Sequence, residues 1–201
     1  MISILDYDAG NIKSVEKALN FLGEDAVITR DSKVIEKSDR VILPGVGSFG
    51  DAMNKLRSYE LDKVIYDYVQ SGRPFLGICL GLQLLFEESE ETVGAKGLGL
   101  LQGSIRKIPS DGGLKVPQIG WNDISINPKS RLFKGIEGNP YVYFVHSYYL
   151  TCADREDVAA TTNYGVEIHA AVEHGNIFAC QFHPEKSSDV GLKILKNFIE
   201  L

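Results

Sequence analysis

The amino-acid sequence predicts a protein of the α/β class, with an open, mostly parallel sheet flanked by helices and an additional antiparallel β portion in its C-terminal half. In the first half, short apolar runs alternate with amphipathic helical segments, the pattern of parallel β-α-β units. After about residue 97 the rhythm changes to β-rich segments separated by Gly, Asn and Asp turns. No repeat or linker interrupts the 201 residues, so we expect residues 1–201 to form a single domain with one shared sheet and one core.

The first half carries the parallel units. Residues 2–6 form a short apolar strand, and Asn11 can then cap a helix with one apolar face that ends at Gly23. The pattern continues with a strand at 25–29, a strand at 40–44, a helix at 59–72 and a strand at 74–79. Because strands this short and apolar are buried on both sides, helices are expected on both faces of the sheet.

The second half is predicted to be mostly antiparallel. Its strands are expected at 100–108, 142–150, 157–164, 166–174 and 176–182. A last helix at about 188–200 places its apolar residues on one face. The prediction is therefore a flavodoxin-like sheet extended by an antiparallel portion.

The composition excludes several classes of protein. A formal net charge of −6 argues against a broad binding surface for nucleic acid or anionic membrane. The N-terminus lacks the basic start of a signal peptide, and no window approaches the roughly 20 apolar residues that cross a bilayer. The three cysteines lack metal-ligand spacing, and their odd number suits a reducing compartment. We expect a cytoplasmic protein without nucleic-acid, membrane or metal binding.

A glycine-rich loop follows the strand at 40–44. Gly45, Gly47 and Gly50 form G-x-G-x-x-G, which in dinucleotide-binding proteins follows the first strand and precedes an acidic strand end about 20 residues on. Here the motif follows the third strand, and the later region lies inside a helix, so the nucleotide interpretation is weak. The alternatives are a turn in which glycine permits positive φ, and a loop whose N–H groups bind another anion.

The next strand ends in a pattern typical of a nucleophile elbow. Gly77, Cys79 and Gly81 form G-x-C-x-G, the thiol version of G-x-S-x-G. The small flanking residues allow a tight turn from strand to helix, and a helix N-terminus behind the sulfur favours the thiolate. The competing interpretation is a buried cysteine that acts as a small hydrophobe. The two glycines favour a nucleophile.

A cysteine nucleophile needs a base and a group that orients the base. His183 follows an apolar strand, is restricted by the adjacent proline, and has Glu185 two residues on to accept the second imidazole N–H. His146 alternates with aromatic residues and is the second choice. The sequence thus predicts a Cys79-His183-Glu185 triad, with a plain turn before the last helix as the alternative interpretation of H-P-E.

The glycine loop then has a role next to the elbow. In a doubly wound sheet the ends of neighbouring strands share one crevice, so the amides of this loop can face the elbow sulfur across a substrate. The backbone N–H groups of Val46 and Leu80 are the expected donors to the oxyanion of a tetrahedral intermediate.

Six stretches carry a family resemblance over almost the whole chain. "PGVGSFGDAM", "GICLGLQLLFEES" and "FHPEKS" together resemble the triad, or class I, glutamine amidotransferases. "DYDAGN", "PQIGWN" and "YFVHSYY" are similar to the branch that serves as glutaminase subunits of imidazole glycerol phosphate synthases. Asp8 departs from this pattern, because glycine is equally expected there, and an acid could alter contacts at a subunit junction.

The resemblance implies an activity and its residues. Cys79 would attack the side-chain amide of glutamine, His183 would transfer the proton, Glu185 would orient His183, and a γ-glutamyl thioester would be hydrolysed to glutamate. By family correspondence, the glutamine-binding residues would be Gly47, Gln83, Ser147 and Tyr148. The resemblance implies no cofactor.

The resemblance also implies a partner. Ammonia would pass to a separate (β/α)₈ cyclase subunit, in a heterodimer that makes imidazole glycerol phosphate and AICAR in histidine biosynthesis. The residues implied at the junction are Asn11, Trp121, Tyr143 and Lys186. We expect the isolated chain to be a poor glutaminase, because the glycine loop would need the partner to orient it.

Two other functions fit the residues less well. A cysteine hydrolase, or a glutaminase serving a different synthase, would keep the triad and change the partner. A flavodoxin-like binding module would keep the fold and use Cys79 only for packing.

Overall fold

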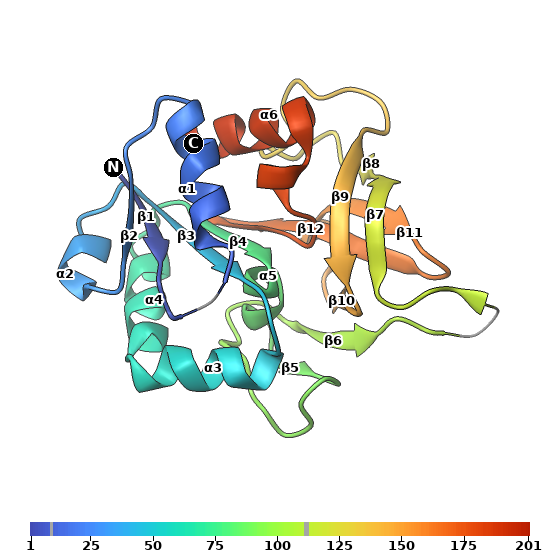
Figure 1. Cartoon of the computed structure of the whole chain (residues 1–201), viewed down its shortest axis with the longest axis horizontal. Helices are drawn as coiled ribbons and strands as arrows, with labels where there is room; N and C mark the ends of the chain where they lie inside the picture. The colour runs from blue at the N-terminus through green and yellow to red at the C-terminus, as the bar shows by residue number, and fades with distance from the viewer. Residues whose placement is uncertain (9, 111–112) are drawn as a thin grey trace.

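The computed structural model describes residues 1–8, 10–110 and 113–201, and its centre is an eight-stranded sheet (Figure 1). The strand order is β2-β1-β3-β4-β13-β12-β11-β8. The strands from β2 to β13 pair in parallel, and those from β13 to β8 pair antiparallel. The bounds are β1 Ile2–Leu5, β2 Ala26–Thr29, β3 Arg40–Gly45, β4 Phe75–Cys79, β8 Ser125–Ile126, β11 Val158–Asn163, β12 Glu167–His174 and β13 Ile177–Cys180. The expected open, mostly parallel α/β sheet with an additional antiparallel portion is confirmed, and the order places β13 beside β4 in the fifth position.

Helices cover both faces of this sheet, as the apolar strands predict (Figure 1). One face packs against α1 and α6, and the other against α3, α4 and α5. The helix bounds are α1 Ile12–Phe21, α2 Ser32–Ile35, α3 Phe49–Ser58, α4 Leu61–Gln70, α5 Leu80–Leu84 and α6 Ser188–Ile199, with 3₁₀ turns at Arg155–Asp157 and Pro184–Lys186. No described helix has the length and apolar character that crossing a bilayer requires.

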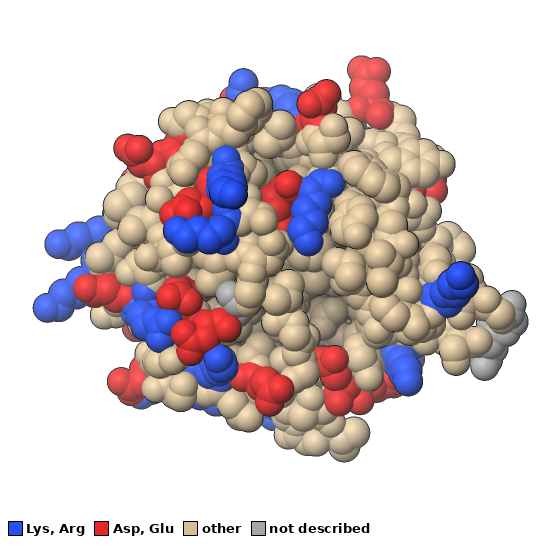
Figure 2. All heavy atoms as spheres, in the orientation of Figure 1, with Lys and Arg blue, Asp and Glu red and all other residues tan. Residues whose placement is uncertain are grey.

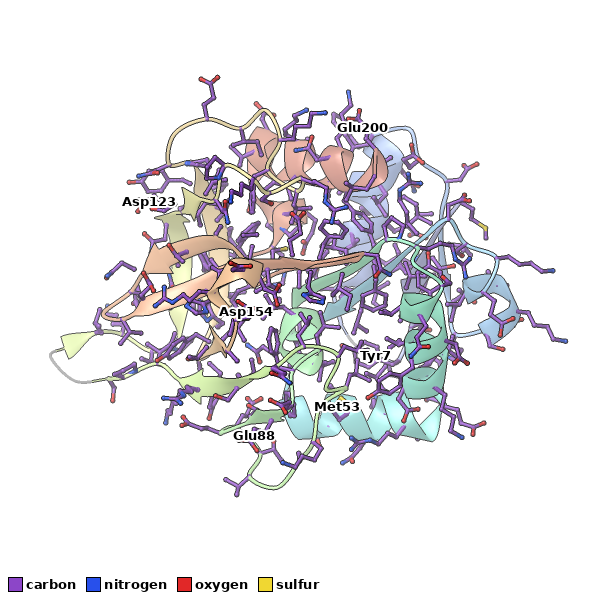
Figure 3. The ribbon with its side chains drawn as sticks, turned by 180° about the vertical axis from the view of Figure 1, so that it is seen from behind. Tyr7, Met53, Glu88, Asp123, Asp154 and Glu200 are labelled. Atoms are coloured by element: carbon purple, nitrogen blue, oxygen red, sulfur yellow. The ribbon has the colours of Figure 1, made fainter. Side chains whose placement is uncertain are left out.

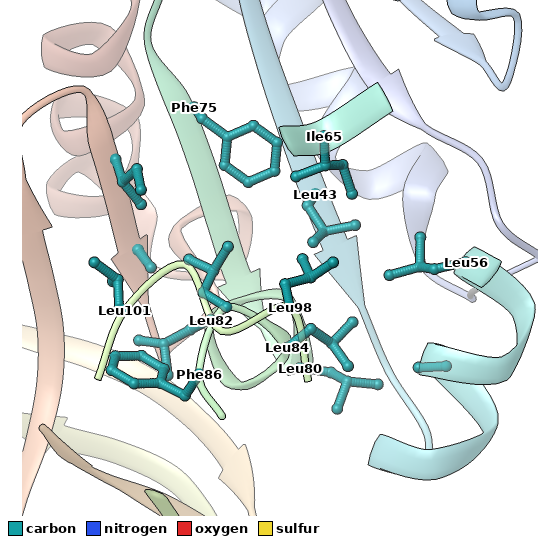
Figure 4. Packing of buried hydrophobic residues seen from close by; sticks show 14 of the residues in the cluster. Leu43, Leu56, Ile65, Phe75, Leu80, Leu82, Leu84, Phe86, Leu98 and Leu101 are labelled. Carbon is teal, nitrogen blue, oxygen red and sulfur yellow. The ribbon is translucent and has the colours of Figure 1, made fainter. Parts of the chain in front are cut away.

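The prediction of one core is wrong. Alternate residues of each strand point to opposite faces, so the sheet separates two apolar clusters. Leu43 and Phe75 pack with the residues of α3 to α5, the cluster seen in Figure 4, whereas Ile42 and Leu76 pack against α1 and α6. Helices on both faces necessarily give a doubly wound sheet two cores.

Two small sheets complete the C-terminal half. The first has the order β10-β6-β5, and the second is the pair β7-β9. The bounds are β5 Glu88–Ser89, β6 Gly103–Lys107, β7 Gln118–Asp123, β9 Tyr141–His146 and β10 Tyr148–Cys152. The predicted strand at 142–150 is therefore two strands that part at Ser147, because β9 pairs with β7 whereas β10 pairs with β6. The sequence pattern did not show this break, since apolar and aromatic residues continue through it.

Two local predictions about helices need correction. The glycine loop leads directly into α3, a helix that was not predicted, and Ser48 caps this helix by accepting from the N–H of Asp51. Asn11 stands at the N-cap position of α1, but its backbone is left-handed, with φ 71°, and its side chain makes no cap hydrogen bond. The Asn11 side chain instead donates a hydrogen bond to Glu185.

Candidate active site

Cys79 lies at a junction where the backbone has no spare room. It is the last residue of β4 and precedes α5, with φ 56° and ψ −109°, values that a non-glycine residue rarely adopts. A Cβ on Gly81 would lie 1.8 Å from the carbonyl oxygen of Leu43, and one on Gly77 would lie 2.8 Å from that of Gly81. The two glycines therefore let β4 turn sharply into α5 against β3, which is the geometry that the elbow motif predicts.

His183 and Glu185 lie on the segment after β13, the strand that neighbours β4. His183 Nδ1 is 2.8 Å from Glu185 Oε1, and a carboxylate can only accept, so Nδ1 carries the proton. Both side chains are almost completely buried. Asn11 Nδ2 donates to the same Oε1 at 2.9 Å. Two donors thus fix the carboxylate that orients the imidazole.

A cavity of about 290 Å³ brings the predicted residues together. Cys79 and His183 both line it, although they are separated by 104 positions in the chain. Its walls also include all of the residues predicted for oxyanion and glutamine binding: Val46, Gly47, Leu80, Gln83, Ser147 and Tyr148. The cavity opens where β3, β4 and β13 end, the crevice in which open α/β sheets bind ligands.

The charge state of His183 suits proton transfer. Burial works against a charge on this ring, but hydrogen bonding and charge interactions with Cys79 and Glu185 outweigh it and raise the pKa of His183 to about 9. In the part of the chain that the structure describes, Nε2 of His183 has no partner of regular hydrogen-bond geometry. Nε2 is therefore the atom left to exchange a proton at the cavity.

His146, the second-choice base, has a different environment. It is 6% exposed, and burial lowers its pKa to about 4, so the ring is neutral. Nδ1 lies 2.8 Å from the carbonyl oxygen of Tyr148, and Nε2 lies 2.9 Å from the side-chain amide of Gln118. In the neutral ring Nδ1 donates to Tyr148, and Nε2 can only accept, which requires the NH₂ group of the Gln118 amide to face it, so neither nitrogen is left for the Cys79 thiol.

The glycine loop borders the same cavity with a more open backbone. Val46 is 39% exposed, and Gly47 has φ 101° with open space where a Cβ would stand. Leu80 is the first residue of α5, so its N–H has no carbonyl one helical turn back to bind. Beneath the loop, Tyr7 donates to the carbonyl oxygen of Pro44 at 2.8 Å, and Figure 3 shows Tyr7 in the interior.

Two residues of the site carried no recognised signal in the sequence. Glu91 lines the cavity, and its Oε2 accepts from the N–H of Phe49 at 2.7 Å, which ties the start of α3 to this wall. Its position within a run of acidic residues resembles a solvated loop. Gln181 donates from Nε2 to the Cys79 sulfur at 3.7 Å. A glutamine directly after an apolar strand, two residues before His183, was the available signal in the sequence, and its complete burial is known only from the structure.

The four residues predicted at a subunit junction fall into two groups. Trp121 and Tyr143 are cross-strand partners on β7 and β9, with ring centroids 6.1 Å apart, and Lys186 Nζ lies 5.9 Å from the Tyr143 ring. Trp121 is 52% exposed. Asn11 is instead partly buried, and its side chain donates a hydrogen bond to Glu185.

Asp8, the departure from the family pattern, belongs to a cluster of charged groups. It accepts from Tyr59 at 2.6 Å and from Arg30 at 2.8 Å, and Lys55 lies 3.4 Å away. Hydrogen bonds from Tyr59 and Arg30 lower the pKa of Asp8 to about 2. Its backbone is left-handed, with φ 62°, which accounts for the expectation of glycine at this position. Its effect on a subunit junction stays a prediction.

Comparisons of the sequence with known proteins point to one family. The family model described as "Glutamine amidotransferase class-I" matches residues 3–201. A relative from Caldanaerobacter subterraneus subsp. tengcongensis, "Imidazole glycerol phosphate synthase subunit HisH", is 48% identical over 201 residues, which are 100% of this chain and 98% of the relative. A protein of the same name from Methanothermobacter thermautotrophicus is also 48% identical, with 100% and 98% covered.

Solved structures share the fold at low sequence identity. "Crystal structure of glutamine amidotransferase" has a TM-score of 0.77 at 21% identity and covers 99% of this chain and 97% of that one. "Structure of PurLQS from Thermotoga maritima" has a TM-score of 0.76 at 21% identity, with 99% and 97% covered.

Proposed function

This chain belongs to the class I glutamine amidotransferase family, and we propose that it is the glutaminase subunit of an imidazole glycerol phosphate synthase. In this function it hydrolyses glutamine to glutamate and ammonia. The ammonia passes to a partner cyclase that makes imidazole glycerol phosphate and AICAR in histidine biosynthesis. The observation that carries the proposal is that Cys79 and His183 line one cavity, with Glu185 hydrogen-bonded to His183.

The first half of the reaction uses the thiolate of Cys79 and the protonated imidazole of His183. The Cys79 thiolate attacks the side-chain amide carbon of glutamine, and the carbonyl oxygen takes the negative charge. The N–H groups of Val46 and Leu80 stabilise that oxyanion. His183 then gives its Nε2 proton to the amide nitrogen, the C–N bond breaks, and ammonia leaves. A γ-glutamyl thioester remains on Cys79.

The second half restores the enzyme. Water attacks the thioester carbon while His183 Nε2 takes a proton from it, and the C–S bond breaks to release glutamate and the thiolate. Glu185 keeps the Nδ1 proton in place throughout, because its Oε1 accepts from Nδ1 at 2.8 Å. Asn11 restrains Glu185 in turn.

The remaining cavity residues fit a free amino acid. Glutamine presents an ammonium and a carboxylate at one end, and Glu91 supplies a carboxylate to the cavity wall for the ammonium. The carbonyl oxygens of Ser147 and Tyr148 already accept hydrogen bonds, so the backbone N–H groups of Gly47, Ser147 and Tyr148 are the proposed donors to the substrate carboxylate. Both donors of Gln83 Nε2 are already used within the protein, so only its Oε1 is left for the substrate.

An apolar face is the proposed contact with the cyclase. Ile119 and Tyr141 are 63% and 60% exposed, and Trp121 lies between them on the β7-β9 pair. In Figure 2 the surface over β7 and β9 carries few charged groups, whereas acidic and basic groups are mixed over the left side of the same view. Exposed aromatic residues at this density are typical of protein interfaces. We propose a (β/α)₈ cyclase as the occupant, in a heterodimer.

The test compares the wild type and Cys79→Ala in complex with the cyclase. The variant is expected to lose glutamine-dependent product formation by at least about a thousandfold, because the thioester can no longer form. Product formation from added ammonium salt is the control, since it needs the cyclase alone and should be unchanged. Unchanged glutamate release by Cys79→Ala would exclude the triad, and a wild-type complex that releases no glutamate would favour a binding module.

A second measurement distinguishes the partner. The chain should co-purify with the cyclase, and glutamate release by the isolated chain should be far slower than by the complex, because the open loop carrying Val46 is then unoriented. A glutaminase that serves another synthase would keep the Cys79 dependence without binding the cyclase. Full turnover without any partner would contradict the proposed loop activation.

A further inference from the structure

A continuous chain of buried hydrogen bonds leads to the Cys79 sulfur from the side chains behind it. Gln181 Nε2 lies 3.7 Å from the sulfur, and Gln181 Oε1 lies 3.0 Å from Gln83 Nε2. Gln83 Nε2 also lies 3.1 Å from the carbonyl oxygen of Tyr148. Gln181 is fully buried and Gln83 is 5% exposed. The triad mechanism leaves Gln181 without a role.

The direction of this chain follows from its outer end. The carbonyl oxygen of Tyr148 can only accept, so Gln83 must turn its NH₂ group toward it. The same NH₂ group faces Gln181, which must therefore present its oxygen. The other end of the Gln181 amide, the NH₂ group, then faces Cys79. The oxygen and nitrogen of one amide cannot be told apart when that amide is considered alone, but this network fixes both amides. The Cys79 sulfur must therefore be the acceptor.

Backbone contacts also fix where Gln181 stands. It follows β13 directly, next to β4 in the sheet, where Cys180 pairs with Ile78. Its N–H donates to the carbonyl oxygen of Ala170 at 2.8 Å. Gln181 is not part of the cavity wall, so it reaches the sulfur without reaching the space for substrate.

We propose that Gln181 is a positioning residue for the nucleophile, which aims the Cys79 sulfur and stabilises its thiolate by donating an amide N–H. A thiolate accepts more strongly than a thiol, so the bond favours the reactive form. This donor is independent of His183 and stays in place while the imidazole gives and takes its proton. The inference rests on the proposed function, since it assumes that Cys79 is the nucleophile.

The test measures alkylation of Cys79 by iodoacetamide across pH, followed at the Cys79 peptide by mass spectrometry. Gln181→Met keeps the approximate size and removes the donor. The alkylation rate at neutral pH is expected to fall about tenfold, the size of effect of one hydrogen bond to a charged group, and the profile should move to higher pH. In the complex with the cyclase, kcat for glutamine should fall about as much, and by a larger factor than any rise in KM that follows from the lost acceptor of Gln83.

The other two cysteines are internal controls in the same samples. Burial raises the pKa of Cys152 to about 11 and that of Cys180 well above its usual range, so both should stay unreactive at neutral pH. A variant that merely loosens the structure would expose Cys152 or Cys180 to alkylation. Asn197→Leu is the matched control variant, since Asn197 is also a buried amide with two hydrogen bonds, to Leu132 and Lys134, away from the cavity.

A second variant covers the case in which Gln181→Met does not fold. Gln181→Glu keeps the shape and the acceptor for Gln83, but it turns a carboxylate oxygen toward the sulfur, and the loss of Cys79 alkylation should exceed that of Gln181→Met. Cys79 alkylation and kcat within about twofold of wild type in either folded variant would overturn the inference. Retained glutaminase activity in Cys79→Ala would overturn the proposed function instead, so the two failures are distinguishable.

Discussion

The two strand-to-helix junctions that border the cavity are built in opposite ways. At the β4-α5 junction, Gly77 and Gly81 leave no space for even one added carbon atom, and the helix that follows is completely buried. At the β3-α3 junction, Gly45 also packs tightly, against Tyr7 and Leu80, but at the tip of the loop Val46 is exposed and Gly47 has open space where a Cβ would stand. The proposed nucleophile is thus fixed by backbone contact, whereas the tip of the loop at Val46 and Gly47 has room to change conformation.

The largest expected effect is at the crowded junction. In Gly81→Ala the new Cβ would lie 1.8 Å from a backbone oxygen of β3, so strand and helix must separate. We expect a loss of more than about 4 kcal/mol in the free energy of unfolding, together with loss of glutaminase activity. Urea unfolding measures the loss. Gly138→Ala is the control, because it has open space; similar stability of the two variants would contradict the rigid elbow.

The second prediction tests whether the cavity wall that contains His146 is as rigid as the β4-α5 junction. The pKa of His146 is about 4 in the folded chain and about 6.5 in the unfolded chain. Between these pH values the unfolded chain binds a proton at His146 and the folded chain does not. This contribution to stability is complete above pH 6.5 and is lost as pH falls toward 4, by about 3 kcal/mol in all.

Urea unfolding at several pH values between 4 and 7 measures this loss. His146→Gln removes the titrating group and should flatten that part of the profile. An unchanged slope in His146→Gln would show that another group titrates and that the neutral His146 is not part of the rigid wall.

The smallest expected change in stability is in the open loop. Gly47→Ala meets no atom, but its φ of 101° is unfavourable for an L side chain, so the free energy of unfolding should fall by only about 1 kcal/mol. Glutamine turnover in the complex should fall much more, because the loop aims the Val46 N–H. Gly23→Ala, which has a positive φ and open space away from the cavity, should change stability alone. Equal turnover in both variants would contradict the role of the loop.

Local patterns in the sequence predicted the elements that have a strong period or a tight steric requirement. The apolar runs located β1 to β4, and G-x-C-x-G located the elbow, because only glycine fits beside Cys79. The break at Ser147 and helix α3 were missed. The break at Ser147 depends on which strands pair with β9 and β10, and the start of α3 depends on capping by Ser48. Neither changes the spacing of apolar residues in the sequence.

The sequence could not predict most of the support around the triad. Asn11 has the residue type of a helix cap, yet its amide serves Glu185, 174 positions away. Glu91 resembles one more solvated acid until the fold places it on the cavity wall. Such roles depend on which segments the sheet order brings together, and a single sequence does not state that order.

By itself, the sequence determined the chemical groups of this protein: a thiol in a tight turn, an imidazole with a nearby carboxylate, and a loop rich in glycine. Only the tertiary structure decided that they act at one place. Parallel strands carry their C-terminal ends to one edge of the sheet, and the insertion of β13 beside β4 brings His183 to the cavity of Cys79. The same neighbourhood buries Gln181 against the sulfur, since a hydrogen bond depends on distance in space and not on separation along the chain.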